Sequence, residues 1–335
     1  MSILNTASER KLETANHFYD LTADATPIAL RNFLYWAKRT AGADLFMRQE
    51  SAEKGFQKLS ESSLSIRTVL SSISPNLKAP LFVVGAPRSG TTFLGDCINV
   101  LPEYSYHFEP VATVAASRYL YHNKWSFQHA CFFYRLVYKW LMRIHLEGNL
   151  RFTEKSPDNC FLIPFLHQCF PDAKFIHIIR DGRDSALSNT KKPWLSSFSN
   201  GSGLREPSGY LFGSRPRYWV EPDRALEFQN TSDIHRCIWC WRRHVEAALN
   251  HSSFLPSNQF FEVRYESLVT YPELNADEIL DFLEIDEPKS KAIFRSIASK
   301  ANINSIGTWK RELSSQQKKI VEQEAGALLE SLGYQ

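Results

Sequence analysis

Several features are scarce in this chain of 335 residues, and each scarcity removes a class of protein. The formal net charge is only +3, which gives no reason to expect a nucleic-acid-binding or polybasic membrane protein. Long apolar runs are missing, since even the most apolar window, 125–146, is interrupted by Arg135, Lys139 and Arg143. We therefore expect a buried amphipathic helix in this window and no transmembrane segment.

Signals for secretion and for a zinc site are missing as well. The first residues carry charges from Glu9 onward and contain no apolar core of a signal peptide. Cys237 and Cys240 have C-x-x-C spacing, but no second pair accompanies them at zinc-finger spacing, so we interpret them as half-buried thiols in a helix. We expect a cytoplasmic protein in a reducing compartment, without a metal site.

The pattern of apolar residues divides the chain into two parts. Residues 1–76 have helical periodicity and are predicted to form an N-terminal helical extension, with one apolar face made by Leu30, Phe33, Leu34, Ala37 and Leu45. In 77–335, apolar strands are predicted at 81–85, 150–153, 174–180 and 259–265. Helices are predicted at 91–100, 125–147, 183–190, 233–250, 275–284 and 315–331. Buried strands that alternate with helices favour an α/β fold with a central parallel sheet flanked by helices.

The most informative run of the sequence lies between residues 81 and 94. An apolar strand leads into a glycine loop, and a helix begins at Thr91. Gly85 and Gly90 allow a sharp turn, and the helix N-terminus supplies free N–H groups to an anion. The G-x-x-x-x-G spacing is that of a nucleoside-triphosphate P-loop, but Thr91 occupies the position of the required lysine and Arg88 lies inside the loop. The loop is predicted to bind a phosphate group, though not a triphosphate with Mg²⁺.

A second motif begins at the end of the strand predicted at 174–180. Arg180 ends this strand, and Ser188 lies about two turns into the next helix. An arginine and a hydroxyl in this arrangement can hold a second phosphate through charge-assisted hydrogen bonds. Both motifs follow strands, where ligands of parallel sheets bind.

Together, the two motifs resemble the sulfotransferases that use 3′-phosphoadenosine 5′-phosphosulfate. The residues that resemble this family's loop for the 5′-phosphosulfate are Pro87, Arg88, Ser89, Gly90, Thr91 and Thr92. Arg180 and Ser188 resemble its 3′-phosphate site, and the resemblance extends from about residue 81 to the C-terminus. It implies a nucleotide donor that places one bridging phosphate in the loop and requires no metal.

The resemblance also implies a reaction and its catalytic residues. A sulfuryl group would pass by in-line displacement to an acceptor hydroxyl, in preference to an amine, where positioning and charge stabilisation dominate catalysis. Glu109 has the family's spacing for the base, and His107 is the alternative base. Lys155, which follows the strand predicted at 150–153, would bind the bridging oxygen together with Arg88.

Two further contacts with the donor follow from the same resemblance. Tyr265 resembles the family's tyrosine near the nucleotide. In the segment 307–311, either Lys310 or Arg311 would supply a basic contact, and the sequence leaves this choice open.

Acceptor recognition is the least defined part of the sequence. Residues 191–231 have no clear period and are predicted to be a lid over the acceptor, with Trp239 and Trp241 as a further wall. Arginines in the long segment suit either an acidic acceptor or solvent: Arg205, Arg215 and Arg217. A carbohydrate, a lipid, a peptide tyrosine and a small molecule all remain open as acceptors, as does the oligomeric state.

Two other functions compete with a sulfotransferase. A degenerate P-loop kinase would require a lysine in place of Thr91. A non-catalytic nucleotide-binding protein on the same fold is the second alternative, because a fold does not guarantee an activity.

Overall fold

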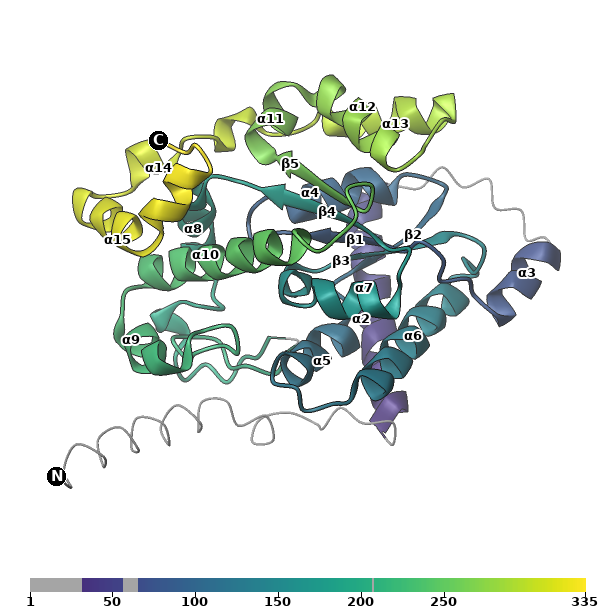
Figure 1. Cartoon of the computed structure of the whole chain (residues 1–335), viewed down its shortest axis with the longest axis horizontal. Coiled ribbons are helices and arrows are strands. Elements are labelled where there is room, and N and C mark those ends of the chain that lie inside the picture. Colours follow the sequence, from purple (N-terminus) through teal and green to yellow (C-terminus); the bar gives the residue numbers. More distant parts are fainter. Residues whose placement is uncertain (1–31, 57–65, 207) are drawn as a thin grey trace.

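The structure, a computed structural model, describes residues 32–56, 66–206 and 208–335. Its five parallel strands form one sheet in the order β2-β3-β1-β4-β5, with helices on both faces (Figure 1). The strands are β1 (Leu81–Val84), β2 (Tyr104–Phe108), β3 (Arg151–Lys155), β4 (Lys174–Ile179) and β5 (Phe260–Arg264). This architecture confirms the predicted α/β class.

The helices fall into three groups along the chain. The helices before the third strand are α2 (Phe33–Glu53), α3 (Ile66–Ile73), α4 (Thr91–Asn99), α5 (Val111–Tyr121) and α6 (Phe127–Ile144). The central ones are α7 (Ile163–Cys169), α8 (Gly182–Thr190), α9 (Ala225–Asn230) and α10 (Asp233–Ser252). The last are α11 (Tyr265–Thr270), α12 (Pro272–Phe282), α13 (Pro288–Ala298), α14 (Trp309–Glu312) and α15 (Ser315–Ser331).

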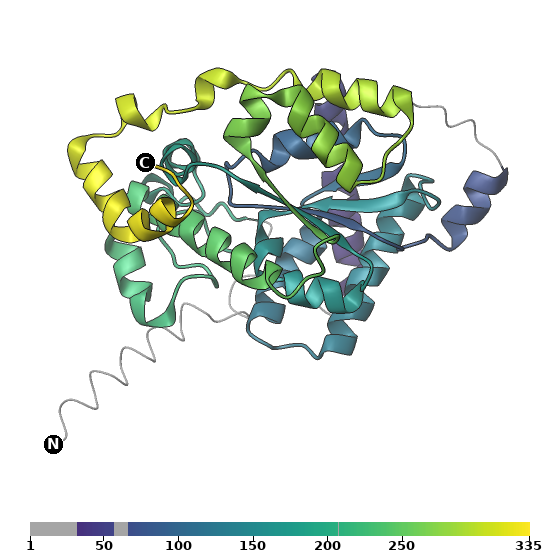
Figure 2. The ribbon, with the colours of Figure 1, turned by 45° about the horizontal axis from the view of Figure 1, so that its top comes forward.

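Alternation along β1 explains why both faces of the sheet are covered. Leu81 and Val83 are fully buried on one face, in a core shared with α4, α12 and α13. Phe82 and Val84 are fully buried on the other face, against α5, α6 and α7. Figures 1 and 2 show these two helical layers above and below the sheet. Since side chains of a strand point alternately to its two faces, a strand buried on both sides must be apolar throughout.

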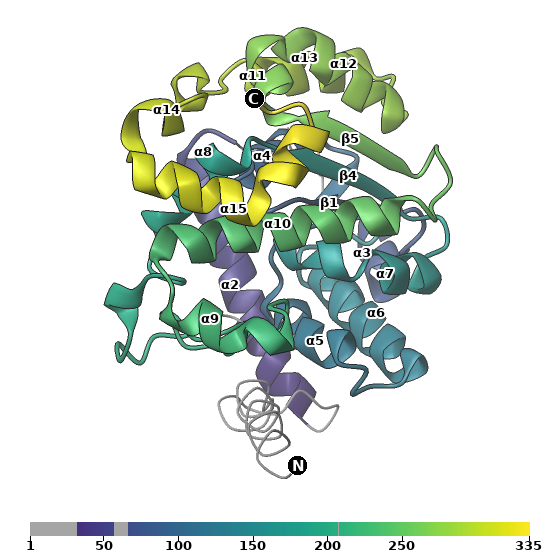
Figure 3. The same ribbon diagram turned by 60° about the vertical axis from the view of Figure 1, so that its left-hand side comes forward.

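A third core joins the C-terminal helix to the long segment that precedes α10. Trp219, Phe228, Ile238 and Leu329 are all buried in it. Figure 3 shows α15 lying along α10. The segment 191–231, expected to be an irregular lid, therefore contributes several buried side chains and contains the short helix α9.

Helix α2 corrects one expectation about the N-terminal part. Leu34 and Leu45, assigned to its apolar face, are 73% and 53% exposed, whereas Ala37 is buried as expected. The face that packs inward instead carries the polar residues Thr40 and Asp44. Hydrophobic periodicity failed here because hydrogen bonds to the rest of the chain make polar side chains the buried ones. The predicted Leu30 lies outside the described residues.

The cysteines also depart from expectation. Cys131 of α6 and Cys169 of α7 form a disulfide, with their Cα atoms 5.6 Å apart. Disulfides persist in oxidising compartments, so this bond argues against the reducing compartment that we expected. Cys237 and Cys240 are buried in α10, where burial raises the pKa of both thiols. Among the described helices, none has both the length and the hydropathy to cross a membrane.

The register of the sheet decides what meets at its carboxyl edge. Phe108 of β2 pairs with Lys155 of β3, and Val83 of β1 pairs with the same lysine. The amide N–H of Glu109 donates to the carbonyl oxygen of Lys155 at 2.9 Å. The residues that follow β1, β2, β3 and β4 are therefore neighbours although they are far apart in sequence.

Candidate active site

Two cavities open at the carboxyl edge of the sheet, and they share the wall formed by Arg88, Thr91 and Thr92. The first, which we call the cationic cavity, measures about 380 Å³, and its lining includes Arg88, Arg180, Ser188, Lys191, Tyr265, Ser305 and Thr308. The second, the carboxylate cavity, measures about 310 Å³, and its lining includes Glu109, Lys155, Asp158, Glu206, Arg217, Trp219 and His244. The predicted binding loop is the partition between them.

The backbone of this loop requires its two glycines. Gly85 has φ 152°, and a Cβ atom there would lie 2.3 Å from the carbonyl oxygen of Ile178. Gly90 has φ 96°, and a Cβ atom there would lie 2.4 Å from the ring of Tyr265. The loop thus approaches β4 and α11 too closely for any side chain at these positions. It delivers the N-terminus of α4 to both cavities, where free N–H groups favour an anion.

The six predicted loop residues separate into lining and supporting positions. Gly90 lines the cationic cavity, and Pro87 lines the carboxylate cavity. Arg88, Thr91 and Thr92 line both, as the partition requires. Ser89 is buried and its hydroxyl lies 3.3 Å from the hydroxyl of Ser185 in α8, so it supports the loop from behind.

Arg88 and Arg180 both line the cationic cavity, whose lining also includes Asp184. Arg88 donates from Nε to Ser188 Oγ at 3.2 Å, and Arg180 donates to the carbonyl oxygens of Arg88 and Ser305 at 3.0 and 2.5 Å. The Arg180 guanidinium lies 4.7 Å from the ring centre of Tyr265, and within the described part of the chain its buried Nε has no hydrogen-bond partner. Burial and the charge of Arg180 lower the pKa of Arg88. A bound polyanion would satisfy both the spare donor and the paired positive charges.

Asp184 of α8 holds the C-terminal segment over the cationic cavity. Its carboxylate accepts hydrogen bonds from the Gly307 N–H at 2.6 Å, the Thr308 hydroxyl at 2.7 Å and the Trp309 N–H at 2.9 Å. The Tyr265 hydroxyl also lies 2.8 Å from that of Ser305. The segment 302–308 is thereby fixed beside Arg180 and Ser188. The sequence did not predict that Asp184 holds this segment, because it shows only an aspartate near the start of a helix.

Neither basic residue left open near the C-terminus is among the described residues that line the cationic cavity. Lys310 and Arg311 are exposed on α14. Lys191, which sequence reasoning missed, does line it and forms an ion pair with Glu312 at 2.7 Å. A lysine in an irregular segment has no sequence pattern that would indicate a binding role, so only the three-dimensional structure shows that Lys191 lines the cavity.

Glu109 and Lys155 form a close ion pair at the edge of the carboxylate cavity. The distance from Lys155 Nζ to Glu109 Oε1 is 2.5 Å, and the ammonium lies 3.6 Å from the ring centre of Phe108. Lys155 is only 1% exposed, and burial lowers its pKa, although the charge of Glu109 opposes this. The Glu109 side chain is 29% exposed, so a ligand in the cavity can reach the carboxylate. Glu109 has φ 40°, in the sparsely populated left-handed region.

His107, the alternative base, lies away from both cavities. It precedes Phe108 on β2 by one position, so its side chain points to the other face of the sheet from Phe108. The ring is fully buried, with Nδ1 2.9 Å from Asp44 of α2 and Nε2 2.9 Å from the hydroxyl of Ser105. Burial lowers its pKa. The structure thus corrects this alternative, because His107 anchors α2 and has no contact with the loop.

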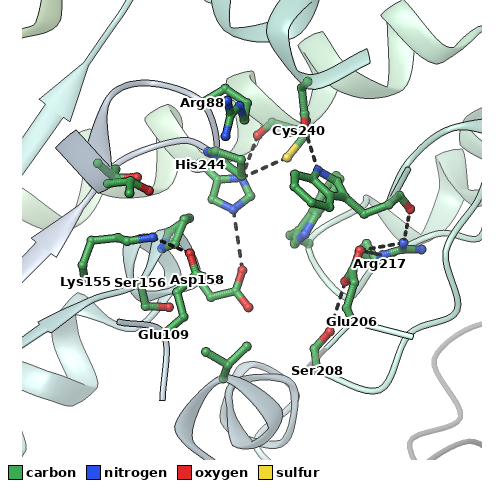
Figure 4. A pocket seen from close by; sticks show the side chains of 18 of the residues that line it. Arg88, Glu109, Lys155, Ser156, Asp158, Glu206, Ser208, Arg217, Cys240 and His244 are labelled. Atoms are coloured by element: carbon green, nitrogen blue, oxygen red, sulfur yellow. Dashed lines mark hydrogen bonds and ion pairs between the residues drawn. The ribbon is translucent and has the colours of Figure 1, made fainter. Parts of the chain in front are cut away.

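The far wall of the carboxylate cavity comes from the long segment before α9 and from α10 (Figure 4). The lining residues of the long segment are Trp194, Leu195, Glu206, Ser208, Arg217 and Trp219. Arg217 is buried and pairs with Glu206 at 2.8 Å, so it does not stand in solvent. The α10 residues on the wall are Cys240 and His244, in place of the two tryptophans that we expected.

Those tryptophans serve the core. Trp239 donates from Nε1 to Glu221 at 2.7 Å, and Trp241 donates to the carbonyl oxygen of Arg180 at 3.0 Å. Both are essentially buried. Trp241 also leaves no room for a side chain on Gly182, whose Cβ atom would lie 2.6 Å from the indole.

The fold and this site together define a class of protein. A glycine loop between a strand and a helix, at the carboxyl edge of a parallel sheet, is typical of α/β proteins that bind phosphate groups. The profile of the sulfotransferase family matches residues 80–289, more than half of the chain. The chain belongs to the sulfotransferase family.

Individual relatives are distant. Protein-tyrosine sulfotransferase A of Caenorhabditis elegans is 22% identical over 219 residues, covering 61% of this chain and 50% of that protein. Protein-tyrosine sulfotransferase of Drosophila melanogaster is 24% identical over 227 residues, covering 63% and 39%. The match thus spans half or less of these relatives. Sulfotransferase STF9 from Mycobacterium avium shares the fold, with a TM-score of 0.50, 13% identity and 96% of each chain covered.

Proposed function

We propose that the protein transfers a sulfuryl group from 3′-phosphoadenosine 5′-phosphosulfate to an acceptor hydroxyl. One observation carries the proposal: the cationic and carboxylate cavities share the loop 87–92 as their common wall, with Glu109 and Lys155 beside it. A group-transfer enzyme requires a donor site and an acceptor site that meet at the reacting group. The two cavities supply these sites on opposite sides of one anion-binding loop.

The cationic cavity suits the nucleotide. The loop N–H groups and the hydroxyls of Thr91 and Thr92 would hold the 5′-phosphosulfate. Arg180 and Ser188 would hold the 3′-phosphate, and the spare Arg180 Nε supports this assignment because it lacks a partner in the cavity. Tyr265 would lie beside the nucleotide, and Lys191 adds positive charge at the rim. The cavity lacks the loop lysine that a triphosphate requires, since Thr91 takes that position.

The catalytic roles follow from the position of the Glu109–Lys155 pair. Glu109 would accept the proton of the acceptor hydroxyl as its oxygen bonds to sulfur. Lys155, aided by Arg88, would stabilise the negative charge on the bridging oxygen as its bond to sulfur breaks. The products are a sulfate ester, adenosine 3′,5′-bisphosphate and a proton. Arg88 contacts Ser188 in the cationic cavity and also lines the carboxylate cavity, so its positive charge would act on ligands in both cavities.

Calorimetric titration with adenosine 3′,5′-bisphosphate tests the donor site. We expect the wild-type protein to bind the bisphosphate in preference to ATP–Mg²⁺. We expect Arg180→Ala to weaken this binding by about 10- to 100-fold, because it removes charge-assisted hydrogen bonds. Arg295→Ala is the matched control, since Arg295 lies on α13 and pairs with Asp277 at the surface. A preference for ATP–Mg²⁺, or equal binding by Arg180→Ala, would refute the proposed donor.

A further inference from the structure

Asp158 and His244 lie opposite each other on the wall of the carboxylate cavity. Asp158 follows β3 at the start of a short 3₁₀ helix (Pro157–Phe161), and His244 lies on α10. The distance from His244 Nε2 to Asp158 Oδ1 is 3.8 Å, too long for a hydrogen bond. His244 is 1% exposed, and its buried Nε2 has no hydrogen-bond partner among the described residues. Figure 4 shows the ring and the carboxylate facing each other across this gap.

The partner of the other ring nitrogen fixes what His244 offers to a ligand. Nδ1 lies 2.7 Å from the carbonyl oxygen of Cys240. A carbonyl oxygen only accepts, so Nδ1 carries the proton, and in the neutral ring Nε2 is an acceptor. The edges of Phe161 and Trp219 contact the ring, with centroids 4.7 and 5.7 Å away, and hold its orientation. With the ring neutral, Nε2 and Asp158 Oδ1 are thus two hydrogen-bond acceptors that face the same gap, while Ser117 donates to the other carboxylate oxygen, Oδ2, at 3.5 Å.

Among the described residues that line this cavity, two of the three arginine and lysine side chains are ion-paired. Arg217 pairs with Glu206 at 2.8 Å and donates to the carbonyl oxygen of Trp194 at 2.7 Å. Lys155 pairs with Glu109. Arg88, the remaining cation of the lining, also lines the cationic cavity. At the Asp158 wall, a negatively charged acceptor would therefore meet a carboxylate, while the guanidinium of Arg217 is already paired and Arg88 lies on the side shared with the cationic cavity.

One more cation lies behind the wall. Arg118 of α5 is 2% exposed, and its guanidinium stacks against the rings of Tyr119 and Tyr210. It is not among the described residues that line either cavity. Arg118 therefore has no assigned contact with a ligand in either cavity.

We propose that Asp158 and His244 bind a hydrogen-bond-donating group of the acceptor, an ammonium or a hydroxyl, remote from the hydroxyl that is sulfated. This inference rests on the proposed function and specifies its acceptor: a small molecule, or one terminal group of a larger one, with an apolar body and a donor at its far end. The volume of about 310 Å³ and the indoles of Trp194 and Trp219 suit such a body. Acidic acceptors are disfavoured.

Four phenols of one shape test this preference: tyramine, with an ammonium tail; tyrosol, with a hydroxyl tail; 4-propylphenol; and 3-(4-hydroxyphenyl)propionate. Calorimetry on protein saturated with adenosine 3′,5′-bisphosphate measures their binding separately from any turnover. We expect tyramine and tyrosol to bind about 10-fold or more tightly than the other two, because only they donate to the pair. The order of tyramine and tyrosol then distinguishes an ammonium from a hydroxyl ligand.

Asp158→Asn keeps the shape of the side chain and removes its charge, so we expect it to abolish the preference for tyramine and to leave 4-propylphenol unchanged. His244→Gln checks the second acceptor, and Asp172→Asn, at an exposed turn, is the matched control. Equal binding or no binding of all four phenols, or an unchanged order in Asp158→Asn, overturns the inference. Failure of the wild-type protein to bind the bisphosphate would instead overturn the proposed function, so the two failures are distinguishable.

Discussion

The cationic and carboxylate cavities lie on two sides of one loop, yet they are built in different ways. The cationic cavity takes most of its charge from short motifs at strand ends, such as Arg88 and Arg180. The carboxylate cavity takes its far wall from residues 194–219 and from α10, which lie far from those motifs in sequence. The residues assigned to the donor in the proposed function thus belong to local motifs, whereas those of the far wall come from distant segments that meet only in the fold.

The two cavities also differ in their electrostatics. The arginines of the cationic cavity face one another, and Arg180 retains an unsatisfied donor. In the carboxylate cavity, Glu109 and Glu206 each neutralise a cation, which leaves Asp158 and His244 as acceptors. Under the two proposals, the first cavity therefore binds a polyanion and the second a molecule that donates hydrogen bonds.

The largest effect should come from the junction of the two cavities. Glu109→Gln removes the proposed base while preserving its size, and we expect turnover to fall about 10²- to 10⁴-fold. Binding of the bisphosphate should remain within a few-fold of wild type, because no contact with the bisphosphate is assigned to Glu109. Single-turnover transfer from labelled donor measures the first quantity and calorimetry the second. Glu273→Gln, exposed on α12, is the control; unchanged turnover in Glu109→Gln would assign the base elsewhere.

A smaller effect, confined to bisphosphate binding, is expected from a substitution at Gly90. Gly90→Ala would place a Cβ atom 2.4 Å from the Tyr265 ring at φ 96°, which costs about 1–3 kcal/mol in backbone strain and displacement of the ring. We expect bisphosphate binding to weaken and the order of affinities among the four phenols to persist. Gly42→Ala adds the same methyl group to α2, where nothing lies within 4 Å, and should change neither. A changed phenol order in Gly90→Ala would mean that the two cavities are not independent.

A substitution in helix α2 should have the smallest effect, a change in stability alone, since no described residue of α2 lines either cavity. Burial raises the pKa of Asp44, but its pairing with His107, the hydrogen bond from His145 and the charge of Arg48 more than offset this and hold the pKa far below 3.8. A depressed carboxylate pKa stabilises the fold above the unfolded-state pKa, and this contribution is lost as the pH falls below about 3.8.

We therefore expect Asp44→Asn to be less stable than wild type near neutral pH by about 1–3 kcal/mol. The difference between the two proteins should narrow from about pH 5 to about pH 3, because only the wild type loses this contribution. Urea unfolding at several pH values measures it. A difference that does not change with pH would contradict the assigned role of Asp44, and altered binding in either cavity would contradict the independence of α2.

The sequence predicted four of the five strands, missing β2, and it predicted most of the residues that line the cationic cavity, because these features depend on local rules. A buried strand, a glycine loop and a helix start leave a pattern that survives without any knowledge of distant residues, as in residues 81–94. The predicted helices at 183–190 and 315–331 match α8 and α15 closely for the same reason. Seven predicted donor-side residues line the cationic cavity: Arg88, Gly90, Thr91, Thr92, Arg180, Ser188 and Tyr265.

The missed features depend on contacts between distant parts of the chain. Strand β2 carries Ser105 and His107, whose burial is possible only because Asp44 and Glu147 accept their hydrogen bonds. The sequence gives no reason to connect these positions. The pair of Asp158 and His244, 86 positions apart in number, is hidden for the same reason.

A crystal structure of the protein with adenosine 3′,5′-bisphosphate would test the proposal that the nucleotide binds in the cationic cavity and the acceptor in the carboxylate cavity. The account predicts that the nucleotide fills the cationic cavity, with its 5′-phosphate on the loop 87–92 and its 3′-phosphate on Arg180 and Ser188. The carboxylate cavity, with Glu109 and Asp158, should stay free of nucleotide. A nucleotide in the carboxylate cavity, or phosphates that do not contact Arg180, would contradict the account.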